Sequence, residues 1–78
     1  MGERVYGFHA IEEALKKAGM GSTIYLQRNG GERIQSLERQ AQLTGKVAVK
    51  KVSKEELERM MPGVDLRGAL LDLGGPRR

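Results

Sequence analysis

The pattern that most constrains this chain is the alternation of β-rich and amphipathic helical stretches along its 78 residues. Read from the N-terminus, the order is β-α-β-α-β-α-β. Alternation of this kind predicts a mostly parallel sheet with helices packed on its faces. A chain of this length provides one such domain and no room for a second. The sequence therefore predicts a single domain of the α/β class.

Strands are expected where β-branched, aromatic and aliphatic residues cluster between turn-forming residues. Such segments occur at residues 4–6, 22–27, 47–52 and 68–73. Glycine, asparagine and proline separate them from the helical stretches, as in Asn29-Gly30-Gly31 and Pro62-Gly63.

Helices are expected where apolar residues recur at three- and four-residue spacing. One such stripe covers residues 8–18 and consists of Phe8, Ile11, Leu15 and Ala18. Another covers residues 31–44 and consists of Ile34, Leu37 and Ala41. A third helix should begin after Ser53, because Ser53 and Glu56 have the spacing of a capping box. Leu57, Met60 and Met61 are its expected inward residues.

The composition excludes several classes of protein. There is no cysteine and a single histidine, which excludes disulfides and makes a structural zinc site very improbable. No secretory signal or membrane-spanning run is present, so a cytoplasmic location is expected. The net charge of +4 favours a polyanionic partner. The few aromatic residues argue against a platform of several rings for single-stranded RNA.

His9 lies in the first turn of the first expected helix, beside backbone N–H groups that lack intrahelical acceptors. It could donate a hydrogen bond to an RNA phosphate or base, or it could simply pack on a neighbour or face water. No serine or acid stands at a spacing that suggests catalysis with it.

The segment Arg28-Asn29-Gly30-Gly31-Glu32-Arg33 follows an expected strand, where ligands of open α/β sheets tend to bind. Arg28 and Arg33 could clamp phosphates, and the glycines would let the backbone approach closely. The segment matches neither nucleotide-binding glycine motif. A flexible turn with solvated charges is the simpler alternative.

Two further basic segments are candidates. The segment 46–54 contains four lysines and no acidic residue: Lys46, Lys50, Lys51 and Lys54. Because side chains alternate along a strand, Lys50 and Lys51 are expected to point to opposite faces. Part of this cluster could contact RNA or only protect a sheet edge. Arg67 precedes the last strand and could read a phosphate or a base edge, or it could lie in a solvated turn.

Several of these segments together resemble the substrate-binding domain of SpoU/TrmH-type RNA 2'-O-ribose methyltransferases. Tyr6-Gly7-Phe8-His9-Ala10-Ile11 with Ala14-Leu15 is similar to the opening of that family. The other similar segments follow in the same order as in the family: Ile24-Tyr25-Leu26, the run from Leu37 through Gly45 to Val47, Ser53 to Leu57, and Gly63-Val64 with Gly68-Ala69-Leu70-Leu71. The resemblance covers nearly the whole chain.

This resemblance implies an α/β/α sandwich like the ribosomal L30e and L7Ae proteins, and recognition of structured ribosomal or transfer RNA. Residues 1–73 would form the RNA-binding domain, and residues 74–78 would begin a linker to a C-terminal catalytic domain. S-adenosylmethionine would bind that domain, so no cofactor is expected in this chain. The isolated domain is expected to be a monomer.

The chain departs from the family at one point. Where the family commonly has His-Gln-Gly before the last strand, this chain has Leu66-Arg67-Gly68. The side chains expected to contact RNA are polar or basic and are spread along the chain: Arg4, His9, Arg28, Asn29, Arg33, Lys51 and Arg67.

Two alternatives remain open on the sequence. The chain could be a stand-alone L30e-like protein that binds ribosomal or kink-turn RNA. It could also be a protein-interaction module, which an exposed apolar patch would favour. An enzyme acting alone is disfavoured, because the sequence offers no catalytic constellation.

Overall fold

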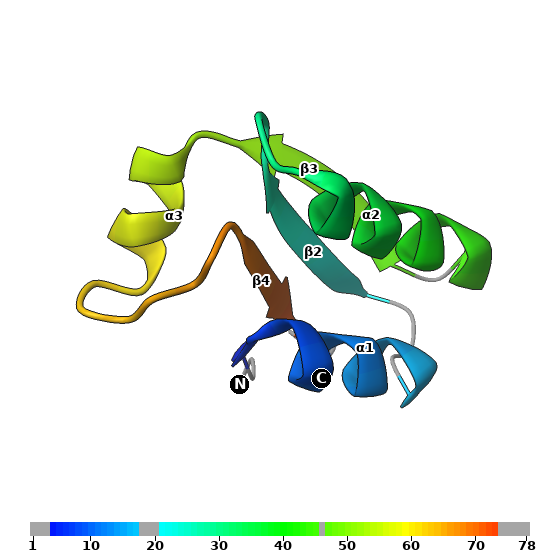
Figure 1. The fold of residues 1–78 in the computed structure, drawn as a ribbon. Coiled ribbons are helices and arrows are strands. Elements are labelled where there is room, and N and C mark those ends of the chain that lie inside the picture. The colour runs from blue at the N-terminus through cyan, green and yellow to red at the C-terminus, as the bar shows by residue number, and fades with distance from the viewer. Residues whose placement is uncertain (1–3, 18–20, 46, 74–78) are drawn as a thin grey trace.

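The computed structural model describes residues 4–17, 21–45 and 47–73, and it confirms the predicted order of elements (Figure 1). The elements are β1 (Arg4–Tyr6), α1 (Phe8–Lys17), β2 (Ser22–Gln27), α2 (Glu32–Thr44), β3 (Val47–Val52), α3 (Lys54–Met60) and β4 (Ala69–Asp72). The second helix begins one residue later than predicted, and β4 is shorter by one residue at each end. Ala18, Lys46 and the expected linker at 74–78 lie outside the described residues.

The expectation of a mostly parallel sheet is wrong. The strands are ordered β1-β4-β2-β3, and only the β2–β3 pair is parallel. β4 lies between β1 and β2 and is antiparallel to both. The alternation of elements gives β1, β2 and β3 a common direction, but it does not reveal that a reversed strand is inserted among them.

The third helix explains why β4 is reversed. β3 ends beside the end of β2, with Val52 opposite Gln27. α3, about 10 Å long at 1.5 Å per residue, packs at that same end of the sheet, where Leu57 meets Leu66 and Leu70. The chain therefore re-enters the sheet from the end at which β3 finishes. β4 must then run in the direction opposite to β3.

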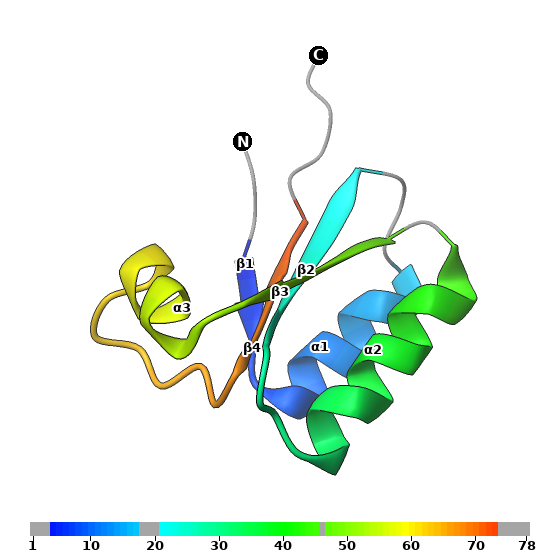
Figure 2. The ribbon, with the colours of Figure 1, turned by 90° about the horizontal axis from the view of Figure 1, so that it is seen from above.

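The helices cover the two faces of the sheet unequally. Figure 2 shows α1 and α2 on one side and α3 on the other, which gives three layers. The larger core lies under α1 and α2, where Ile11 and Leu37 pack on Ile24 and Leu71 of the central strands. Alternation along the strands sends Leu70 to the opposite face, where it joins the smaller core under α3.

The start and end of α3 follow the predicted chemistry. The Ser53 hydroxyl accepts a hydrogen bond from the Glu56 N–H at 3.2 Å, which caps the helix. Leu57 is buried, and Met60 and Met61 pack half-buried around it. None of the helices in the described part of the chain is long and apolar enough to cross a membrane.

Candidate functional site

Four chain connections meet at one end of the sheet. β1, β2 and β3 end there, and β4 begins there, because β4 alone runs in the opposite direction. We call this end the loop edge and define it as residues 7–9, 28–33, 53–54 and 64–68. Most side chains that the sequence suggests for RNA contact lie on these segments.

Backbone hydrogen bonds join these connections to one another. The Arg28 N–H donates to the Val52 carbonyl at 3.0 Å, which holds the β2–α2 loop beside the start of α3. The Gln27 N–H donates to the Gly68 carbonyl at 2.9 Å, which holds it beside the loop before β4. The loop edge is therefore one connected surface, in which each loop limits the position of the next.

Gly30 allows the β2–α2 loop to lie directly on the first turn of α2. A Cβ atom at this position would overlap the Ile34 side chain, which is itself buried. The Gly30 N–H also donates to the Gln27 carbonyl at 3.2 Å and so closes a tight turn. This close packing fixes where Arg28 and Asn29, both exposed, leave the surface.

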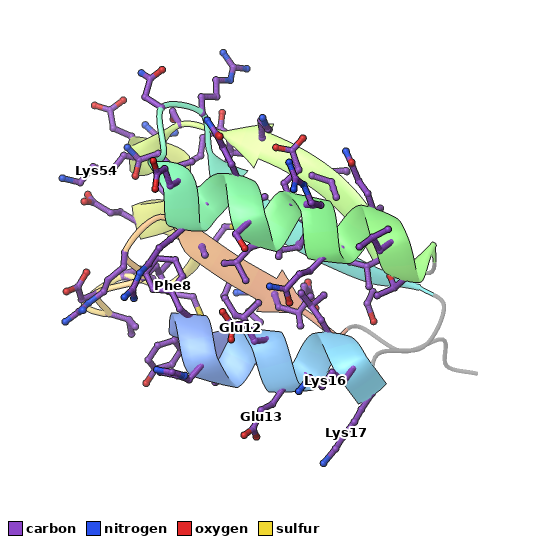
Figure 3. The ribbon with its side chains drawn as sticks, turned by 45° about the vertical axis from the view of Figure 1, so that its right-hand side comes forward. Phe8, Glu12, Glu13, Lys16, Lys17 and Lys54 are labelled. Atoms are coloured by element: carbon purple, nitrogen blue, oxygen red, sulfur yellow. The ribbon has the colours of Figure 1, made fainter. Side chains whose placement is uncertain are left out.

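The first turns of α1 and α2 bring Phe8 and Arg33 together. The Arg33 guanidinium carbon lies 5.4 Å from the centre of the Phe8 ring, within the range of a cation–π interaction. In Figure 3, Phe8 lies at the start of α1, on the side that faces α2. A surface cavity of about 210 Å³ adjoins the pair and is lined by Phe8, His9, Glu12, Arg33 and Ser36.

A second cavity, of about 380 Å³, lies between α3 and the loop before β4. Its cations are Lys54 and Arg67, and its carboxylates are Glu58 and Asp65. Arg67 has a left-handed backbone conformation, with φ of 54°. Its N–H donates to the Asp65 carboxylate at 3.2 Å, and its Nε lies 3.6 Å from the other carboxylate oxygen.

Leu66 and Arg67, the two residues at which the chain differs from the resembled pattern, lie in different surroundings. Leu66 is buried against Leu57 and Leu70. It therefore belongs to the core under α3 and offers no polar group at the surface. Arg67 is exposed beside it and can contact a ligand.

The structure brings most of the predicted contact residues to the loop edge: His9, Arg28, Asn29, Arg33 and Arg67. Arg4 lies elsewhere, on β1, and its guanidinium donates to the Met60 carbonyl at the end of α3, at 2.9 Å.

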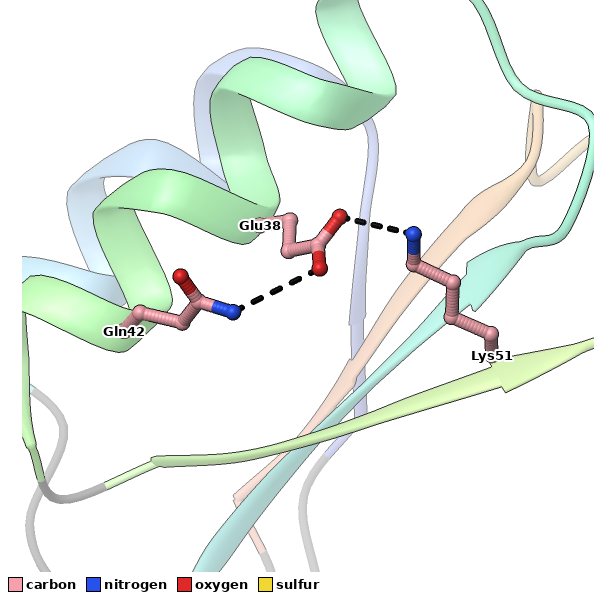
Figure 4. A network of polar contacts seen from close by, with 3 residues as sticks. All are labelled: Glu38, Gln42 and Lys51. Atoms are coloured by element: carbon pink, nitrogen blue, oxygen red, sulfur yellow. Dashed lines mark hydrogen bonds and ion pairs between the residues drawn. The ribbon is translucent and has the colours of Figure 1, made fainter.

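Lys51 also engages another part of the protein. Its Nζ atom lies 2.8 Å from the Glu38 carboxylate of α2, and Gln42 donates to the same carboxylate at 3.4 Å (Figure 4). The ion pair of Lys51 with Glu38 ties the edge strand β3 to α2.

Two residues of the loop edge were missed in the list of expected contacts. Lys54 belongs to the lysine cluster noted in the sequence. It directly follows the predicted N-cap Ser53 and therefore lies just after the end of β3. This place in the sequence could have identified Lys54 as a contact residue. Phe8 was assigned only to the apolar stripe of α1, and no spacing in the sequence links it to Arg33.

Little in the described part of the chain suggests a metal centre or an apolar docking surface. No group of three His, Asp or Glu residues there is close enough to hold a metal ion. The exposed large apolar side chains described are Tyr6 and Leu43, which lie on β1 and at the end of α2. Apolar side chains exposed singly are normal on soluble domains, so the interaction-module alternative gains no support.

Comparison with known protein families finds a match over most of the chain. The model of a family described as RNA 2'-O ribose methyltransferase substrate binding matches residues 4–65. The match includes the β1–α1, β2–α2 and β3–α3 connections and ends directly before Leu66-Arg67-Gly68. No curated protein matches the chain. The chain belongs to the family of RNA 2'-O ribose methyltransferase substrate-binding domains, and this membership indicates RNA binding.

Proposed function

We propose that residues 1–73 recognise structured ribosomal or transfer RNA for an S-adenosylmethionine-dependent RNA 2'-O-methyltransferase whose catalytic domain follows in the full-length protein. The observation that carries this proposal is the convergence of His9, Arg28, Asn29, Arg33 and Arg67 at one edge of a domain of this family. An L30e-like relationship and a cytoplasmic setting, where such RNA is found, are parts of the same proposal.

Phosphate contacts supply most of the attraction in this account. The guanidinium group of Arg28 presents a forked donor that suits phosphate oxygens, and the positive charge of Arg33 adds to the attraction. Lys54 adds a cation across the β3–α3 connection, and Asn29 offers both a donor and an acceptor. Arg67 can exchange its exposed pairing with Asp65 for an RNA phosphate, because both side chains are more than two-thirds exposed and such pairs are weak.

The methyl donor would bind the catalytic domain, where it supplies the transferred methyl group. Small cofactors usually bind in enclosed and largely apolar pockets. The two cavities of the loop edge are open to the surface and carry several charged side chains. They do not fit that requirement, so we assign no residue of this chain to the cofactor.

The proposal can be tested by titrating the chain into a tiled set of labelled ribosomal and transfer RNA fragments at two salt concentrations. The informative variant is Arg28→Ala/Arg33→Ala, which removes two cations from the loop edge. The matched control is Lys16→Ala/Lys17→Ala, which removes two cations from the last turn of α1. Figure 3 shows both lysines at the far end of α1 from Phe8.

We expect the unmodified chain to bind at least one fragment, with an affinity that falls steeply as salt rises. The arginine variant should bind about tenfold more weakly, and its dependence on salt should decrease because fewer counterions are released. The lysine control should change affinity by no more than about twofold. Equal losses in the two variants, or binding that is insensitive to salt, would contradict recognition through the loop edge.

A further inference from the structure

The Phe8–Arg33 pair has a geometry that phosphate binding alone does not require. The Phe8 ring is half-buried against the larger core, so its position is fixed by packing. Arg33 is exposed, and its guanidinium lies over the ring at 5.4 Å from the centroid. The ring thus lies against a cation that is otherwise exposed and accessible to a ligand.

The cavity beside this pair favours a base over a phosphate. Its lining combines the Arg33 guanidinium and the Phe8 ring with the imidazole of His9, the hydroxyl of Ser36 and the carboxylate of Glu12. The carboxylate would repel a phosphate but can accept hydrogen bonds from the amino group of a base. Arginine guanidinium planes and aromatic rings are the surfaces on which unpaired RNA bases stack.

We infer that Arg33, held by Phe8, is a stacking site for one unpaired RNA base, and that Glu12 accepts a hydrogen bond from the amino group of that base. The inference rests on the proposed function and makes it more specific. The RNA that this domain selects then carries an unpaired adenine, cytosine or guanine in a loop or bulge, rather than an uninterrupted duplex.

The low aromatic content of the chain is compatible with this inference. A platform for a continuous single strand needs several exposed rings, and the sequence argues against it. Stacking of one base needs a single planar group, which Arg33 supplies. Phe8 then acts as a positioning residue, because it holds the guanidinium in place and need not touch the RNA.

The test compares two RNA probes that share one stem. One is a stem–loop with an adenine-rich loop, and the other is the same stem closed as a continuous duplex. Arg33→Lys keeps the positive charge and removes the planar fork, so it separates stacking from attraction to phosphate. Loss of one stacked base costs about 1–3 kcal/mol, so Arg33→Lys should weaken stem–loop binding at least about fivefold and duplex binding less than twofold.

Two further measurements avoid dependence on one variant. Glu12→Ala removes the carboxylate acceptor and should reduce the preference of the chain for the adenine-rich loop over a uracil-rich loop of equal length. In the unmodified chain, the NMR resonances of the Phe8 ring should shift when the stem–loop is added and should remain nearly unchanged with the duplex. Circular dichroism would establish that each variant is folded.

The outcomes separate this inference from the proposed function. Unchanged stem–loop binding by a folded Arg33→Lys variant, or equal losses on both probes, would overturn the stacking site and leave RNA recognition intact. Failure of the unmodified chain to bind either probe or any fragment of the tiled set would overturn the proposed function as well. Stem–loop binding that weakens selectively in Arg33→Lys would support the inference.

Discussion

The two helical layers of this domain differ in how firmly they hold the loop edge. Among the described residues, ten are buried in the core under α1 and α2, against three in the core under α3. The β1–α1 and β2–α2 connections rest on the larger core, whereas the loop that carries Arg67 rests on the smaller one. The loop edge therefore combines a rigid part, around Phe8 and Arg33, with a part that is easier to deform.

This division suits the recognition of structured RNA. Stacking and base contacts depend on accurate positions, which the larger core provides. A phosphate contact tolerates more movement, since its electrostatic attraction has little directional preference. We therefore assign specificity to the first turns of α1 and α2, and adaptable attraction to Arg67 and Lys54.

The largest expected effect comes from truncating one leucine in each core. Leu37→Ala in the α1/α2 layer should lower the free energy of unfolding by about 3–5 kcal/mol, because a rigid, extensive core cannot collapse around the cavity. Leu57→Ala in the α3 layer should cost about 2–3 kcal/mol, since fewer neighbours surround it. Urea unfolding of both variants measures the difference. Equal losses would contradict the contrast between the layers.

The packing of the β2–α2 loop provides the next test. Gly30→Ala should destabilise the chain by about 1–3 kcal/mol, because the added methyl group overlaps the Ile34 side chain. Gly31→Ala is the matched control, since no atom lies within 4 Å of a Cβ placed there. The control should cost less than about 1 kcal/mol. Thermal unfolding compares the two, and similar midpoints would show that the loop does not rest firmly on α2.

A smaller effect is expected at Arg67 and has the opposite sign. Arg67→Gly removes a side chain from a left-handed conformation that costs about 1–2 kcal/mol. Part of this gain is offset because glycine has more freedom in the unfolded chain, about 0.5–1 kcal/mol. The variant should unfold at slightly higher urea concentration while binding RNA more weakly. Arg67→Ala, which keeps the backbone strain, should weaken binding with no gain in stability.

The smallest effect is expected at Lys51. Lys51→Met removes the ion pair with Glu38, which is worth about 0.2–1 kcal/mol for partly exposed groups. RNA affinity should change by less than about twofold if Lys51 pairs with Glu38 of α2 and does not contact the RNA. A loss comparable to that of the Arg28→Ala/Arg33→Ala variant would instead return Lys51 to the set of RNA contacts, as the sequence first suggested.

Local patterns in the sequence were sufficient to predict the elements of this fold. Apolar spacing identified α1 and α2, and the pairing of Ser53 with Glu56 identified α3 and its start. The reversed direction of β4 was not predictable from alternation, because it depends on where α3 packs after β3 ends. Strand order of this kind is a property of tertiary packing and has no local signal.

The candidate site was predictable only in part for the same reason. Arg28 and Arg33 could be predicted because they flank a glycine-containing loop after a strand, where ligands of α/β sheets tend to bind. Arg67 could be predicted because it directly precedes a glycine and the last strand. The contact of Arg33 with Phe8 joins two helices and has no periodicity. The pairing of Lys51 with Glu38 likewise required the position of α2 over β3, which the sequence does not state.

The most direct test of RNA recognition through the loop edge is an amide chemical-shift map of the isotopically labelled chain. The map is recorded as the RNA fragment that binds most tightly is added. We expect shifts at residues 7–9, 28–33, 53–54 and 64–68, with little change near Lys16 and Lys17 at the far end of α1. Shifts concentrated at that far end, or spread evenly over the domain, would contradict recognition through the loop edge.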